Sequence, residues 1–388
     1  MIPSRLQPLL VIVGLVVGSV ARTDPEDRDP KDLVASELLE MIPAGKKGSC
    51  ADEPMDQTLQ DAAQLAQNAV DAIDKLLTST LERNDENIKI LNMAYISFGV
   101  RYDVANACEF PELDEASLPF VITDGHQRLN IAHYNFVVAA GRLRMDEQLL
   151  KMECGDEDMR KVTTLGDLGI EPKDKTIKAY NEEVDPSKKI TDQDVVGYYL
   201  LQYFSPQVKP NVYDMKTVVL ASSDKPRTFA LSSPCQGSGG GYFSDVTMIM
   251  LCRDKFKLKS LDQAIQDQDE ITETSDLDKA LDNQETPSTT FLHEVMHWVN
   301  DRSMWTSDVG KKPELIMRIL VTDVAFRPPG YQQQVTAYRT KFCRLLAFDK
   351  EEMDETVVNA DSYKMFAKGV TLNKINWYPK GYSENVGV

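Results

Sequence analysis

Two histidines and a glutamate in residues 289–300, TTFLHEVMHWVN, have the types and spacing of a metal-dependent hydrolytic site. His293 and His297 are four residues apart, so on a helix both imidazoles lie on one face and can bind one Zn²⁺. Glu294 follows His293 directly, which brings a carboxylate near the metal without making it a ligand. That position suits a general base acting on zinc-activated water. The alternative is an ordinary buried helix with two hydrogen-bonded histidines.

The residues around this motif favour a helix. Thr286, Ser288 or Thr289 can cap its start, and Pro287 suits its first turn. Apolar side chains then give the helix a face that can pack against a core: Phe291, Leu292, Val295, Met296 and Val299.

Catalytic zinc needs a third protein ligand and an open water position. A third histidine in the HExxHxxGxxH pattern is excluded, because Asn300 and Ser303 stand where Gly and His are required. Glu314 has the place of a glutamate ligand, but Arg318 follows where an acidic residue is expected. The residues alone leave three further candidates open: Asp301, Asp308 and Asp323.

Two downstream blocks resemble the aspzincins, the deuterolysin and peptidyl-Lys metalloendopeptidase family of secreted fungal zinc proteases. Residues 322–329 read TDVAFRPP and residues 359–366 read NADSYKMF. That family pairs HExxH with a downstream Asp ligand and often ends in an NADxYxxF block. The resemblance covers residues 290–367. It implies His293, His297 and Asp323 as zinc ligands and Glu294 as the base.

The chain departs from the family pattern at two positions that bear on activity. The family has a Tyr after the Asp ligand that donates to the oxyanion, and here that position is Phe326, with Tyr331 or Tyr338 as substitutes. In the lysine-specific branch, the Asp of NADxY and an acidic residue three positions later receive the substrate lysine. The resemblance therefore implies substrate binding by Asp361, but Lys364 at the later position argues against strict lysine preference.

The N-terminus predicts export. Residues 1–21 have the features of a secretory signal peptide, with Arg5 before an apolar stretch and a small-residue cleavage site ending at Ala21. No later segment reaches the roughly 20 apolar residues that span a bilayer, so we expect a secreted, extracellular protein. Residues 22–47 are interpreted either as a pro-segment cleaved after Lys47 or as a flexible extension.

Cysteine count and charge restrict the environment and the partners. All six cysteines lie outside the signal peptide, which favours disulfides, and we predict a bond between Cys235 and Cys252. The net charge of −18 disfavours nucleic acid and anionic membranes as partners. We expect a protein or peptide substrate and a monomer.

Hydrophobic periodicity predicts an α+β domain over residues 48–388, mostly helical with a small mixed sheet. The HExxH motif and the aspzincin resemblance imply that this domain is a zincin-like metalloprotease domain. Residues 154–191 are expected to form an insertion. Helices are predicted over residues 56–81, 87–98, 127–150 and 192–204, and strands over 118–123 and 244–251. We expect residues 246–251 to be an exposed strand beside the metal that pairs with the substrate backbone.

The sequence thus favours a secreted zinc-dependent endopeptidase with Glu294 as general base. The alternative is a secreted zincin-fold binding or effector protein with weak or no peptidase activity. Phe326 is the residue that favours this alternative.

Overall fold

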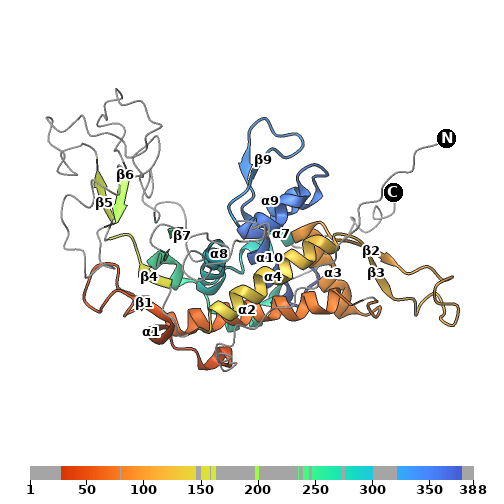
Figure 1. Cartoon of the computed structure of the whole chain (residues 1–388), viewed down its shortest axis with the longest axis horizontal. Helices are drawn as coiled ribbons and strands as arrows, with labels where there is room; N and C mark the ends of the chain where they lie inside the picture. The colour runs from red at the N-terminus through yellow and green to blue at the C-terminus, as the bar shows by residue number, and fades with distance from the viewer. Residues whose placement is uncertain are drawn as a thin grey trace, which may run out of the picture.

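The computed structural model describes residues 28–78, 80–145, 150–157, 159–162, 197–200, 235, 239–243, 247–271, 276–299 and 321–377 (Figure 1). The predicted signal peptide and most of the predicted insertion at 154–191 lie outside these residues. The described chain is α+β, mostly helical with a small mixed sheet, as the sequence predicts. Its α-helices are α1 (Ala35–Leu38), α2 (Met55–Leu76), α3 (Asp85–Phe98), α4 (His126–Arg142), α6 (Leu261–Asp267), α7 (Leu277–Asp282), α8 (Pro287–Val299), α9 (Arg339–Phe348) and α10 (Ala360–Thr371).

The main sheet has four strands in the order β1-β4-β8-β7, formed by Leu39–Met41, Leu150–Cys154, Met248–Leu251 and Gly240–Phe243. β1, β4 and β8 are parallel, and β7 pairs antiparallel to β8. The prediction of an exposed strand over residues 246–251 is wrong, because β8 is an inner strand whose four side chains are all buried. Its uninterrupted apolar run, MIML, is typical of such a strand. β1 and β7 are the two edge strands of this sheet among the described strands.

The other strands form two-stranded pairs: β2 (Arg101–Val104) with β3 (Phe120–Asp124), β5 (Met159–Val162) with β6 (Gly197–Leu200), and β9 (Ala325–Phe326) with β10 (Val335–Thr336). The helix predicted over residues 192–204 is wrong where the structure describes it, since β6 falls inside that range. Gly197 and the two tyrosines that follow it favour an extended chain over a helix. The helices predicted near residues 56, 87 and 127 are confirmed as α2, α3 and α4.

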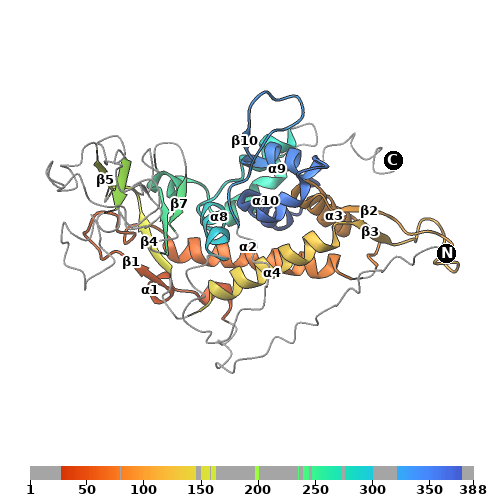
Figure 2. The same cartoon turned by 45° about the horizontal axis from the view of Figure 1, so that its top comes forward.

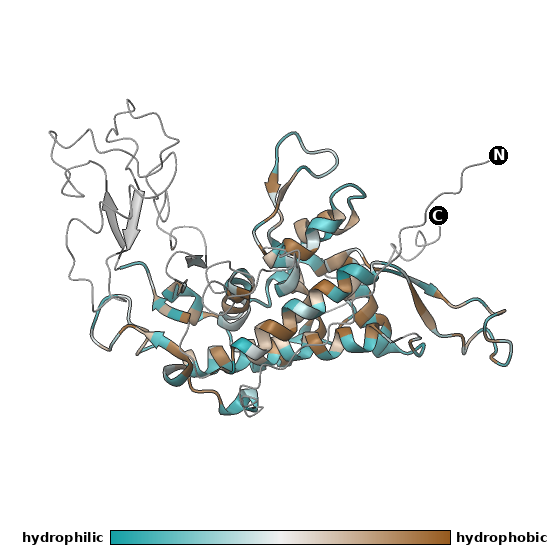
Figure 3. Ribbon diagram, in the orientation of Figure 1, coloured by the Kyte–Doolittle hydropathy of each residue, from teal (hydrophilic) through white to brown (hydrophobic). Residues whose placement is uncertain are grey.

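α2 is the long helix on which the others pack. It contacts α4, α8 and α10, and the views in Figures 1 and 2 agree that α8 lies between the four-stranded sheet and α10. Alanines at 62, 66 and 69 are fully buried on α2, and such small side chains let neighbouring helices approach closely. Apolar stripes along α2 and α4 in Figure 3 mark the faces that enclose the core. The helix α8, which carries the HExxH motif, is therefore packed against neighbouring elements on several sides.

The chain before Cys50 belongs to the folded body. Leu33, Leu38 and Leu39 are buried, β1 pairs with β4, and the backbone N–H of Ala35 donates to Asp56 Oδ1 at 2.7 Å. Lys47 lies in an exposed loop after β1. Removing residues 22–47 would take one strand from the sheet. Cleavage after Lys47 stays a prediction.

Two disulfides close the sheet region. The predicted bond between Cys235 and Cys252 is confirmed, and a second joins Cys50 to Cys154 across 104 residues of sequence. Cys108 is exposed and unpaired, and Cys343 is buried and unpaired. Among the described helices, none combines the length and the apolar character needed to cross a membrane.

Candidate metal centre

The helix α8 presents both histidines of the motif. Thr286 caps it, since its Oγ1 accepts from the Thr289 N–H at 3.2 Å, and Pro287 begins the first turn as expected. Every residue of α8 is buried except His297, which is partly exposed. The helix is thus held in place by packing, and His293 and His297, one turn apart, lie on the face that borders a cleft.

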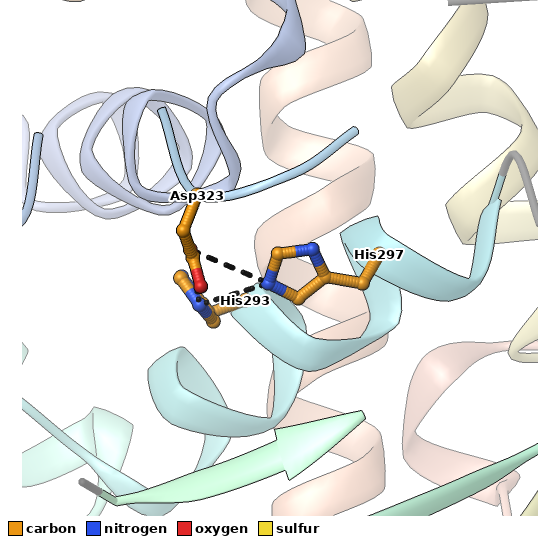
Figure 4. Close-up of side chains that lie close together, drawn as sticks. All are labelled: His293, His297 and Asp323. Atoms are coloured by element: carbon orange, nitrogen blue, oxygen red, sulfur yellow. Dashed lines mark hydrogen bonds and ion pairs between the residues drawn. The ribbon is translucent and has the colours of Figure 1, made fainter. Parts of the chain in front are cut away.

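Three side-chain donors converge at this face (Figure 4). His293 Nε2 lies 3.2 Å from His297 Nε2, and Asp323 Oδ1 lies 3.3 Å and 3.5 Å from these two nitrogens. A tetrahedral Zn²⁺ with ligands at about 2.0 Å separates its donor atoms by about 3.3 Å. The three donors therefore have the spacing and the chemistry that such an ion requires. In the described part of the chain, no other group of His, Cys, Asp and Glu side chains has this arrangement.

The outer ring nitrogens of both histidines also have partners. His293 Nδ1 lies 2.8 Å from Asp361 Oδ1, and His297 Nδ1 lies 3.1 Å from the carbonyl oxygen of Val321. A carboxylate or carbonyl behind a histidine fixes the ring orientation and leaves Nε2 as the free donor, which is the usual arrangement behind metal ligands. Both imidazoles are thus oriented before any ion binds.

Asp323 is fixed by the start of α10. The backbone N–H of Thr322 donates to the carbonyl of Val358 at 2.6 Å, and the Val324 N–H donates to Asn359 Oδ1 at 3.2 Å. These bonds hold the residues on both sides of Asp323 against the NADSYKMF block. Its second oxygen, Oδ2, accepts from the Tyr338 hydroxyl at 2.7 Å. Oδ1 is thereby directed to the histidines.

Neighbouring carboxylates make this position favourable for positive charge. Burial alone would lower the pKa of His293, but Glu294, Asp323 and Asp361 outweigh it and raise that pKa to about 10. Burial likewise favours the neutral form of Asp323, yet its contacts with His293 and His297 hold its pKa well below the usual range. A cation between these groups would take the place of the proton.

Glu294 stands beside the three donors with its own carboxylate buried. Its Oε1 lies 4.0 Å from His293 Nε2, and burial raises its pKa despite the two nearby histidines. The edge strand β7 passes next to it at Gly240. A Cβ at Gly240 would lie 2.5 Å from the Met250 carbonyl oxygen of β8, so only glycine permits this close pairing of β7 with β8. The same Cβ would lie 3.5 Å from Glu294 Oε1, which places Gly240 beside this carboxylate.

A cleft of about 1080 Å³ opens onto these groups. The helix α8, the edge strand β7, and the segments around residues 321–323 and 338–339 provide its walls. Its lining is largely polar and includes His293, Glu294, His297, Asp323 and Asp361. All five site residues named from the sequence therefore meet at one cleft. Asp301, Asp308 and Glu314 lie outside the described residues.

Asp361, the residue expected to bind substrate, is 2% exposed. Its Oδ1 contacts His293 Nδ1 and lies 2.7 Å from Lys364 Nζ, and its Oδ2 accepts from the Arg339 N–H at 2.7 Å. Both oxygens are thus occupied by groups of the chain itself. The geometry is that of a residue which positions His293.

The structure distinguishes between Tyr331 and Tyr338, the two tyrosines named as substitutes for a donor at Phe326. Phe326 is buried in a small apolar cluster with Val324, Ala337 and Leu346. Tyr331 packs on Phe342, whereas Tyr338 lines the cleft and touches Asp323. No local sequence pattern distinguishes the two tyrosines, because β10 brings Tyr338 to the site only through the tertiary fold.

No protein-family model, curated protein sequence or solved structure matches this chain. The geometry of the cleft and the residues that line it are therefore the features of this chain that indicate a function.

Proposed function

We propose that this protein is a secreted zinc-dependent endopeptidase of the aspzincin type, with His293, His297 and Asp323 as metal ligands. The convergence of three correctly spaced donors beside a buried glutamate carries the proposal. The partners of the outer histidine nitrogens support it further, because they leave both Nε2 atoms directed at Asp323 Oδ1. Two disulfides agree with an oxidising, extracellular location.

Zinc bound by these three residues would supply Lewis acidity toward water and the peptide carbonyl. Glu294 takes a proton from the attacking water as the water oxygen bonds to the carbonyl carbon. The C–N bond then breaks, and Glu294 returns the proton to the leaving amine. The raised pKa of Glu294 suits both steps, because the group must accept and release a proton near neutral pH.

Tyr338 has the position expected of a transition-state donor. Its hydroxyl lies at the cleft beside a proposed ligand, where it can turn from Asp323 toward a developing oxyanion. A donor at Tyr338 would compensate for the missing donor at Phe326, the residue that favours the alternative of an inactive binding protein. The edge strand β7 offers an extended substrate a backbone to pair with, since no described strand covers its outer edge.

Metal content and peptide hydrolysis together test the proposal. The purified wild-type protein is expected to hold about one zinc per chain. It is also expected to cleave a peptide mixture in a reaction stopped by chelation and restored by zinc. Asp323→Ala should lose the metal, whereas Glu351→Ala, at an exposed position on another surface, should keep it.

Glu294→Gln should retain zinc and lose at least about a hundredfold in rate. A fully active Glu294→Gln variant, or a wild-type protein that binds no zinc even after the metal is added back, would reject the proposed reaction. Zinc binding without cleavage of any peptide would leave the binding-protein alternative.

A further inference from the structure

Three consecutive residues at the cleft wall are each held by a different carboxylate. Tyr338 donates its hydroxyl to Asp323, Arg339 donates its backbone N–H to Asp361, and Thr340 donates its N–H to Asp282 at 2.9 Å. The middle residue has φ of +65°, a left-handed conformation that is rare for arginine. Such a conformation persists only where the surroundings enforce it, so the fold holds Arg339 in this place.

The carboxylates deeper in this wall are neutralised by lysines of the chain. Lys364 Nζ lies 2.7 Å from Asp361 and 3.2 Å from Glu285, and Lys368 Nζ lies 3.3 Å from Glu285. The side chain of Lys368 is 2% exposed and that of Lys364 is 15% exposed. These two anions and two cations balance in charge. The cluster therefore offers no unpaired carboxylate to a basic substrate side chain.

Arg339 differs from these lysines because it is exposed and lines the cleft. Within the described residues its guanidinium makes no ion pair. A guanidinium presents a planar set of N–H donors that matches a carboxylate in a bidentate manner. Lys255, the remaining cation of the lining, packs against Gly239 beside the edge strand. The unpaired positive charge of Arg339 thus remains at the cleft while the deeper cluster is neutral. The same lining holds the Asp282 carboxylate, which accepts from the Thr340 N–H and hydroxyl and has no cation among its described partners.

We infer that Arg339 binds a carboxylate of the peptide substrate, so that acidic residues near the scissile bond are preferred and basic ones are not. This inference rests on the proposed function, because it requires a peptide substrate bound in the cleft. The carboxylate can belong to an internal Asp or Glu side chain or to the C-terminus of the peptide. Arg339 is thereby the specificity-determining residue.

The experiment uses blocked peptides in which each position in turn carries Glu, Gln or Lys, together with one Gln series that has a free C-terminal carboxylate. Cleavage rates are measured with the wild-type protein, and dissociation constants are measured with zinc-loaded Glu294→Gln. At one or more positions, Glu peptides are expected to be favoured about tenfold over Gln and Lys peptides. If the terminal carboxylate is the group recognised, the free-acid series shows the preference instead.

Arg339→Gln should remove this preference, and Lys341→Gln, an exposed cation on the same helix, should retain it. Equal treatment of Glu, Gln and Lys, with no gain from a free terminus, would overturn the inference, as would a preference that survives in Arg339→Gln. The binding assay separates this inference from the proposed reaction. A preference in binding without any cleavage supports the inference and contradicts the peptidase.

Discussion

At the scale of single residues, the two histidines of the cleft are held in fixed orientations by partners of their outer ring nitrogens. The Nδ1 atoms of His293 and His297 are occupied by Asp361 and by the Val321 carbonyl, so both Nε2 atoms face Asp323 Oδ1. These partners hold both imidazole rings with Nε2 toward Asp323, which is the orientation that metal ligation requires. The hydroxyl of Tyr338 differs from these atoms, because it donates to Asp323 and also faces the cleft.

Tyr338→Phe tests this hydroxyl directly. Its loss is expected to lower kcat about tenfold to a hundredfold with a small change in KM, because the bond forms chiefly in the transition state. Steady-state kinetics on one good peptide provides the measurement, with zinc content as a check on the site. An unchanged kcat would mean that the oxyanion is stabilised elsewhere.

Phe326→Tyr is the informative companion variant. Phe326 is 1% exposed in an apolar cluster, so a hydroxyl there is expected to destabilise the fold by about 1–3 kcal/mol without raising activity.

At the scale of elements, α10 is connected both to the segment that carries Asp323 and to the start of α8. Asn359, at the start of α10, bonds to the strand-like segment that carries Asp323. Glu285, just before α8, accepts from Thr289 and lies within ion-pair distance of Lys364 and Lys368 of α10. The distance between Asp323 and the two histidines of α8 is therefore set by hydrogen bonds and ion pairs, in addition to apolar packing.

Glu285 makes the stability of the protein decrease as the pH falls into the acid range. Burial alone would raise its pKa, but the two lysines outweigh it and lower the pKa to about 2. A carboxyl whose pKa is lower in the folded state contributes stability above its ordinary pKa, and this contribution is lost as the pH falls toward 2.

Glu285→Gln is therefore expected to lower the free energy of unfolding by about 2 kcal/mol at pH 7, with the difference vanishing near pH 2. Denaturant unfolding at several pH values measures it. Glu86→Gln, which disrupts an exposed ion pair with Lys75, should cost less than about 1 kcal/mol. A pH-independent loss in Glu285→Gln would show that its effect is not electrostatic.

At the scale of the whole molecule, the chain before Cys50 is part of the same core as α8. Leu33 and Leu39 belong to the large apolar cluster that also contains Phe291 and Val295 of α8. β1 occupies one end of the sheet and β7 the other, beside Glu294. A pro-segment that ended at Lys47 would thus leave by opening this core.

Leu33→Ala measures how much this segment contributes. The side chain is fully buried, so its truncation is expected to destabilise the protein by about 2–5 kcal/mol. Glu37→Ala, at an exposed neighbouring position, should change stability by less than about 1 kcal/mol. Equal thermal midpoints for Leu33→Ala and wild type would favour a removable pro-segment.

The sequence predicted the parts of the fold that local patterns encode. Helical periodicity and a capping threonine gave α8 and its two histidines, and apolar spacing gave α2. Asp323, the proposed third ligand, lies 26 residues after His297, so only the family resemblance selected it from several aspartates. The edge strand was assigned to β8 in place of β7, because strand order depends on partners far along the chain and not on the strand's own residues.

The bond between Cys50 and Cys154 has a consequence for how the chain is made. The thiol of Cys50 leaves the ribosome 104 residues before its partner. The strand β1 likewise precedes its partner β4 by 111 residues, counted from Leu39 to Leu150. Contacts of such high sequence separation form late because the intervening chain must first be ordered. Cys108 emerges in that interval and stays exposed in the finished fold, so it is available as a wrong partner. Oxidative folding of this protein is therefore expected to benefit from an enzyme that reshuffles disulfides.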